Sequence, residues 1–129
     1  MSLPILTLLF TQSGMIPISV LRHDRYLKGV IVSSQVINET VSVLTRKQGA
    51  NLVAAHEVAE SLLELCEVVP VDERTIREAI RLVRRYKLSH WDSLIVAAAL
   101  LAGCEKLYSQ DMQHGQVFDE QLKVINPFL

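Results

Sequence analysis

The chain has 129 residues, which is enough for one domain with a hydrophobic core and too few for two ordinary domains. Half of the residues are hydrophobic, so we expect apolar surface that a second copy or another partner covers. Lysine and arginine total 13 against 14 acidic residues, and the net charge of −1 excludes a globally basic nucleic-acid-binding protein. Any contact with nucleic acid must depend on a local basic patch or on metal ions.

The two cysteines, Cys66 and Cys104, have neither the spacing of metal ligands nor the density of a disulfide scaffold. We therefore expect reduced thiols and a cytoplasmic location. The N-terminal segment MSLPILTLLFTQSG carries an apolar run without the basic region or cleavage site of a signal peptide, and it is too short to cross a bilayer. We expect neither secretion nor a membrane anchor.

From Gly29 onward, short runs typical of strands alternate with helical patterns, which predicts an α/β fold with a mostly parallel central sheet. The patterns indicate strands at 29–34, 66–72, 106–109 and 122–128, and helices at 34–47, 52–65, 72–86 and 89–102. Pro70 predicts an edge position for the strand at 66–72. The run at 5–10 can be read as a strand, but residues 1–28 show no clear period.

The spacing of apolar residues predicts which helix faces are buried. Ser34 and Asp72 are expected to cap the first and third helices. The third helix should bury one stripe, formed by Ile76, Ala79, Ile80 and Val83. The fourth helix is apolar nearly all round, which predicts the most buried helix, and Gly103 suits a left-handed C-cap.

Two carboxylates lie in predicted helices and allow two interpretations each. Glu39 shares a helix face with Val36, where a carboxylate needs a charged partner, a metal ion or an edge position near solvent. Asp92 completes the pattern of a capping box with Ser89, and it can instead face a metal site. Both interpretations remain open for each residue.

Asp111 comes just after the strand at 106–109, and parallel α/β sheets bind ligands beyond the carboxyl ends of their strands. Glu39, Asp92 and Asp111 can therefore gather at one edge of the sheet. Clustered like charges repel unless a cation neutralises them, which predicts Mg²⁺ or Mn²⁺ held by oxygen ligands. The corresponding chemistry is attack of metal-activated water on a phosphodiester.

Two segments, VIVSSQVINETVSVLTRK and LSHWDSLIVAAALLAGCEKLYSQDMQHGQVFDEQLKVINPF, closely resemble PIN domain proteins of the VapC type, the toxin ribonucleases of bacterial toxin–antitoxin pairs. The most specific elements are the N-E pair, the W-D-S-L-I-V-A-A-A run, the S-x-D-M-Q-H-G turn and the V-I-N-P-F strand, in that order. The resemblance covers 29–128 and leaves 1–28 as an atypical segment of a single PIN-like domain over 1–129.

The resemblance implies a three-layer αβα domain that cleaves RNA with Mg²⁺ or Mn²⁺, is inhibited by a cognate antitoxin and forms homodimers. By resemblance, Glu39, Asp92 and Asp111 are the catalytic and metal-binding residues, and Ser109 matches a small hydroxyl residue near the site. His114, in the turn after Asp111, is a further candidate for contact with substrate.

The chain departs from the family in its acidic residues. The family has an aspartate at the end of its first strand, whereas the first acidic residue here is Asp24, only fifteen positions before Glu39. Gln110 also stands where relatives often carry an acid. Loss of a charged ligand weakens Mg²⁺ binding, so we expect a ribonuclease of impaired activity or, alternatively, an inactive PIN-like module that binds an antitoxin, RNA or itself.

Residues near these acids carry further expectations. Trp91 is expected to pack in the protein rather than to stack on a base. Five arginines make the helix at 72–86 locally basic, which suits RNA contact or a solvated face with the pairs Glu73–Arg77 and Glu78–Arg81. We favour the paired, solvated face.

Overall fold

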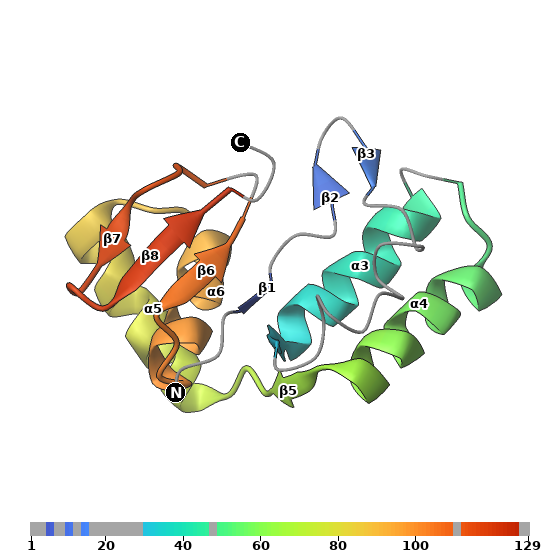
Figure 1. Cartoon of the computed structure of the whole chain (residues 1–129), viewed down its shortest axis with the longest axis horizontal. Coiled ribbons are helices and arrows are strands. Elements are labelled where there is room, and N and C mark those ends of the chain that lie inside the picture. The colour runs from blue at the N-terminus through green and yellow to red at the C-terminus, as the bar shows by residue number, and fades with distance from the viewer. Residues whose placement is uncertain are drawn as a thin grey trace.

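The structure is a computed structural model that describes residues 30–46, 49–109 and 112–126, together with the backbone of 5–6, 10–11 and 14–15. The α/β fold class is confirmed, with strands and helices alternating along the chain (Figure 1). The strands are β1 Ile5–Leu6, β2 Phe10–Thr11, β3 Gly14–Met15, β4 Ile31–Ser33, β5 Glu67–Val69, β6 Lys106–Tyr108, β7 Val117–Phe118 and β8 Leu122–Ile125. The helices are α3 Ser34–Arg46, α4 Leu52–Leu65, α5 Glu73–Tyr86 and α6 His90–Leu101.

The central sheet has the strand order β5-β4-β1-β6-β8-β7, and every neighbouring pair except β7–β8 is parallel. The first strand forms, because Ile5 pairs with Ile31 of β4 and with Leu107 of β6. β5 lies at an edge, as Pro70 predicts. The antiparallel strand β7 and the β2–β3 hairpin were not predicted. The parallel part of the sheet brings the carboxyl ends of five strands, β5, β4, β1, β6 and β8, to one edge.

All four predicted helices are present, and their caps explain where three of them begin. The Asp72 carboxylate accepts the amide of Thr75, and Thr75 in turn accepts the Asp72 amide, so the expected cap of α5 is a capping box. The expected cap of α3 is wrong by one residue, because the hydroxyl of Ser33 accepts the Val36 amide at 3.3 Å. The Ser34 hydroxyl instead accepts the amide of Val71 at 3.0 Å. Ser34 therefore ties the start of α3 to the segment after β5.

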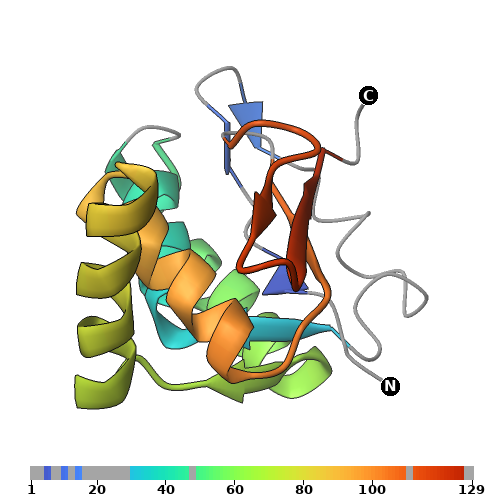
Figure 2. The ribbon, with the colours of Figure 1, turned by 90° about the vertical axis from the view of Figure 1, so that its left-hand side faces the viewer.

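α6 is the most buried helix, as its composition predicts, with every residue from Ser93 to Ala99 buried. Figure 2 shows the reason, since α6 lies between α5 and the sheet. Gly103, with φ +76°, adopts the left-handed conformation expected where the helix ends. In the parts of the chain that the structure describes, α6 and the other helices are too short or too polar to span a bilayer.

The buried face of α5 differs from the predicted stripe. Ile76 and Ile80 are 43% and 41% exposed, whereas Thr75, Ala79 and Leu82 are buried. The buried residues follow the spacing i, i+4, i+7, which is the predicted stripe rotated by about one residue. Because apolar residues occur on more than one face of this helix, their spacing alone does not determine which face of α5 is buried.

Asp119 connects α5 to the turn between β7 and β8. Its carboxylate accepts from Arg81, and the Tyr86 hydroxyl contacts both its carboxylate, at 2.9 Å, and its backbone amide, at 2.7 Å. The Tyr86 ring also packs edge-on against Phe118, with centroids 4.9 Å apart. The Arg81 guanidinium, followed by the Tyr86 hydroxyl, holds the pKa of Asp119 below its ordinary value despite partial burial. Together these contacts, which we call the clamp, join α5 to the β7–β8 hairpin, and they depend on the negative charge of Asp119.

We predict that Asp119→Asn makes the protein less stable at neutral pH and nearly as stable as the wild type in acid. A carboxyl whose pKa is lower in the folded state stabilises the fold above its unfolded pKa of about 3.9, and this contribution is lost as pH falls through the folded pKa. Urea unfolding of both proteins between about pH 7 and pH 3 measures the difference. A difference in unfolding free energy that is constant over this range would contradict the clamp.

Candidate functional site

Glu39 lies in α3 one helical turn after Gln35, and the two side chains are hydrogen-bonded to each other. The Gln35 amide nitrogen donates to Glu39 Oε1 at 2.9 Å and to the backbone carbonyl of Trp91 at 3.3 Å. Trp91 belongs to the first turn of α6 and precedes Asp92 in the chain. One buried amide therefore spans α3 and α6, and it holds the Glu39 carboxylate beside the turn that carries Asp92. This contact places Glu39 near the turn of α6 that carries Asp92, while a shared metal site of the two acids stays a prediction.

Asp92 takes part in only half of a capping box. The Ser89 hydroxyl accepts the Asp92 amide at 3.1 Å, which confirms Ser89 as the N-cap of α6. Within the described residues, the Asp92 carboxylate has no hydrogen bond or ion pair, so it does not return to the Ser89 amide. The partly buried carboxylate is consequently available to a cation.

Two buried polar atoms in this region lack a hydrogen-bond partner in the described parts of the chain, namely Gln35 Oε1 and Ser93 Oγ. Ser93 follows Asp92 directly and is completely buried. A buried oxygen without a partner costs about 1–3 kcal/mol, and such atoms in native proteins commonly mark a water or an ion. Ser93 follows Asp92 in the sequence, and the Gln35 side chain is hydrogen-bonded to Glu39, so both of these oxygens lie close to a predicted acid.

The oxygen atoms of these side chains suit a hard cation. Glu39 and Asp92 supply carboxylate oxygens and Gln35 supplies a neutral oxygen, which are the ligand types that Mg²⁺ and Mn²⁺ prefer. Asp111, the third predicted ligand, lies outside the described residues. Among the described residues alone, no group of three or more His, Cys, Asp or Glu side chains is placed to hold a metal ion. The described part of the site thus contains two carboxylates and one amide.

The two predicted substrate-adjacent residues are both held by backbone amides. Ser109 is buried, and its hydroxyl accepts the Met112 amide at 3.2 Å. His114 is exposed, and its Nδ1 accepts the amide of Asn126 at 2.9 Å, just after β8. Contact of either residue with substrate stays a prediction.

Trp91 is not the packing residue that its sequence position indicated. It is 63% exposed, with its ring edge-on to His90 at a centroid distance of 6.1 Å. The buried face of α6 begins only at Ser93, so the first turn projects into solvent. An exposed aromatic ring beside Asp92 is therefore available for stacking on a nucleic-acid base.

A shallow depression of about 520 Å³ on α5 is lined by Ile80 and four of the helix's five arginines, Arg77, Arg81, Arg84 and Arg85. The expected pairs Glu73–Arg77 and Glu78–Arg81 are both present. Arg85 also lies 3.8 Å from Asp119. The expectation of a solvated, ion-paired face is therefore confirmed for much of this helix.

The cysteines are free and buried, as expected from their number and spacing. Burial raises the pKa of both the Cys66 and the Cys104 thiol to about 11. Both thiols are therefore protonated at neutral pH, and they do not contribute to the acidic site.

A family model of the PIN domain matches residues 19–117, which include Glu39, Asp92 and Asp111. The chain belongs to the PIN domain family. PIN domains are generally nucleases and typically use divalent metal ions, in agreement with the oxygen-rich donors found here. The match begins at residue 19 rather than at 29 and leaves out β1. A comparison with curated proteins gave no significant match.

We predict that Ser89→Ala and Asp92→Asn have different effects on stability in cation-free buffer. Loss of the Ser89 cap should lower the free energy of unfolding by about 1 kcal/mol. Asp92→Asn should stay within about 0.5 kcal/mol of the wild type, because its carboxylate has no partner among the residues that the structure describes and only the weak helix-dipole interaction is lost. Urea unfolding in EDTA measures both. A larger loss in Asp92→Asn than in Ser89→Ala would show that the carboxylate acts as a cap.

Proposed function

We propose that the chain is a metal-dependent endoribonuclease of the VapC toxin type that hydrolyses RNA phosphodiesters. Glu39, Asp92 and Asp111 hold the cation in this proposal. The observation that carries it is the Gln35 amide, which holds Glu39 beside the first turn of α6, where the Asp92 carboxylate is not used by the helix cap. Both acids lie in the matched part of the PIN domain.

When bound, Mg²⁺ or Mn²⁺ supplies positive charge that activates the attacking water and neutralises charge developing on the phosphodiester. Glu39 and Asp92 hold and orient the cation, and Gln35 keeps the two helices at a fixed separation. The Ser109 hydroxyl accepts the Met112 amide, and in this proposal it lies near the cation. The positive charge of the bound cation would attract the phosphates of RNA, in place of the basic surface that the net charge of −1 excludes.

The proposal assigns the RNA contacts to exposed residues around the acids. Trp91 supplies a stacking surface next to Asp92, and His114 lies in the turn that follows Asp111. Substrate binding at this edge requires no basic surface elsewhere on the molecule.

The proposal also includes a cytoplasmic homodimer and inhibition by a cognate antitoxin. Leu52, Val53 and Leu63 on α4 are more than half exposed, and apolar side chains of this size on one helix support a protein partner. The sequence resemblance to VapC toxins supports the antitoxin as one such partner.

One observation favours a second function, that of a PIN-like module that binds without cleaving. β1 occupies the central position of the sheet between β4 and β6, yet it ends at Leu6 and the sequence contains no acidic residue before Asp24. The aspartate expected at the end of the first strand is therefore missing. A site with one charge fewer binds a hard cation more weakly.

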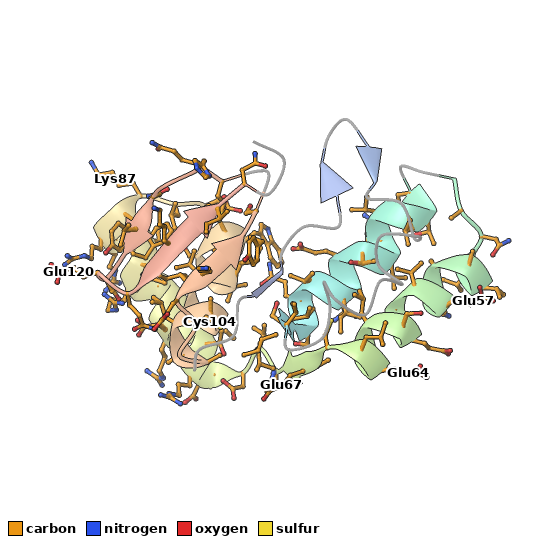
Figure 3. The ribbon with its side chains drawn as sticks, viewed as in Figure 1. Glu57, Glu64, Glu67, Lys87, Cys104 and Glu120 are labelled. Carbon is orange, nitrogen blue, oxygen red and sulfur yellow. The ribbon has the colours of Figure 1, made fainter. Side chains whose placement is uncertain are left out.

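We predict Mn²⁺-dependent cleavage of a mixed RNA pool by the wild type, and a loss of at least about 100-fold in Asp92→Asn and in Asp111→Asn because each removes a charged metal ligand. Glu57→Gln is the matched control, since Glu57 is an exposed acid on α4 at the end of the molecule opposite β7 and β8 (Figure 3). All proteins are purified identically and assayed with and without EDTA.

Cleavage that vanishes in both aspartate variants and persists in Glu57→Gln supports the ribonuclease. Equal cleavage by all four proteins would indicate a contaminating nuclease and contradict the proposal. Absence of cleavage by the wild type would leave the binding module as the function.

A further inference from the structure

We propose that Gln35 is one of the residues that form the cation site. This role rests on the proposed function above. Its amide nitrogen positions Glu39 against α6, and its amide oxygen faces the bound cation as a neutral oxygen. Gln35 is not one of the predicted acids, and although it lies in the first segment that resembles the family, it is not among that segment's most specific residues, the N-E pair. The inference comes from its hydrogen bonds and its burial.

The orientation of the Gln35 amide is fixed by its partners. Glu39 Oε1 and the Trp91 carbonyl oxygen both accept hydrogen bonds and neither can donate. The amide nitrogen must therefore face both of them, because a flipped amide would place an oxygen against two oxygens. This assignment leaves Oε1 on the opposite side of the amide group.

Gln35 Oε1 is a buried acceptor without a donor. The residue is only 8% exposed, and within the described residues no group donates to this oxygen. Since Oε1 and Nε2 share one carbon, Oε1 lies no more than about 5.5 Å from the Glu39 carboxylate oxygen. Two oxygens bound to one Mg²⁺ at about 2.1 Å lie at most about 4.2 Å apart, so the proposal places Oε1 in the nearer part of this range.

A neutral oxygen has a specific advantage at this site. Another carboxylate next to Glu39 would add repulsion in the absence of a cation, whereas an amide donates to Glu39 with one atom and offers an acceptor with the other. Hard cations accept amide oxygens beside carboxylates. Gln35 thus stabilises the cation-free arrangement of the acids and adds an oxygen when the cation is present.

The chain offers a direct readout of cation binding that does not require activity. Trp91 is the only tryptophan, it is exposed, and its carbonyl is bonded to Gln35. Paramagnetic Mn²⁺ bound near Asp92 should quench Trp91 fluorescence, and titration gives the Kd for Mn²⁺. Far-ultraviolet circular dichroism and thermal melts in EDTA show whether each variant is folded.

The variants are Gln35→Met, which keeps the length of the side chain and removes both polar atoms, and Gln35→Glu, which keeps an oxygen but removes the donor. Gln121→Met is the matched control, because the Gln121 amide also donates to two backbone carbonyls, of Leu100 and Cys104, away from the site. Asp92→Asn serves as the variant that lacks a proposed ligand.

We expect Gln35→Met to raise the Kd for Mn²⁺ about 10-fold or more, as loss of groups that orient metal ligands commonly does. Gln35→Glu should bind Mn²⁺ at least as tightly as the wild type, since a charged oxygen replaces the neutral one, and should melt at a lower temperature in EDTA. Gln121→Met should leave the Kd unchanged. If Gln35→Met does not fold, the Kd of Gln35→Glu relative to the wild type decides.

Three results would overturn the inference. A wild-type Kd in Gln35→Met shows that Gln35 has no role in the cation site. A Kd raised equally in Gln35→Glu and Gln35→Met shows that the residue only positions Glu39 and that its oxygen does not face the cation. If Mn²⁺ does not quench the wild type, the proposed metal site fails as well, whereas quenching that is lost only in Asp92→Asn overturns the role of Gln35 alone.

Discussion

Glu39 and Asp92 lie on different helices, so the proposed cation site depends on a contact that joins α3 to the first turn of α6. The Gln35 amide makes this contact by donating to Glu39 and to the carbonyl of Trp91, which fixes the carboxylate beside the turn that carries Asp92. The amide holds the two helices together without neutralising the charge. The remaining negative charge and the unpartnered Gln35 oxygen are what a divalent cation would complement.

The fold and the chemistry depend on the N-terminal segment in different ways. β1 pairs with β4 and β6, so the backbone of Ile5 and Leu6 joins the two halves of the sheet. Pairing of this kind needs backbone amides and carbonyls, and it does not need an acidic side chain. In the sequence, Leu6 is followed by Thr7, and the first acidic residue is Asp24. The sheet can therefore form while the cation site has one charge fewer.

The sequence predicts the helices and the parallel strands well because their apolar residues repeat with a clear period. The convergence of Glu39 and Asp92 stays a prediction, which the contact of Gln35 with Glu39 and with the first turn of α6 supports. The errors in the helices are a cap misplaced by one residue in α3 and a buried face rotated by about one residue in α5. Ser33 rather than Ser34 caps α3, and the exposed Ile80 belongs to a face that spacing alone assigns to the core. Such small rotations depend on tertiary packing.

Side-chain exposure and polar pairing were the hardest features to predict. Trp91 is exposed because the buried part of α6 begins only at Ser93, which no local pattern encodes. Gln35 carried one usable signal, its position four residues before Glu39 on the same helix face. Its second bond, to Trp91 in a distant helix, links positions 56 residues apart and is visible only in the folded chain.

Anomalous X-ray scattering at the manganese edge, from crystals of the full chain grown with Mn²⁺, tests the cation site most directly. The account predicts one strong anomalous peak in contact with the carboxylates of Glu39, Asp92 and Asp111, and no such peak in crystals of Asp92→Asn. A peak at another cluster of acids, or none at the sheet edge at saturating Mn²⁺, would contradict the account.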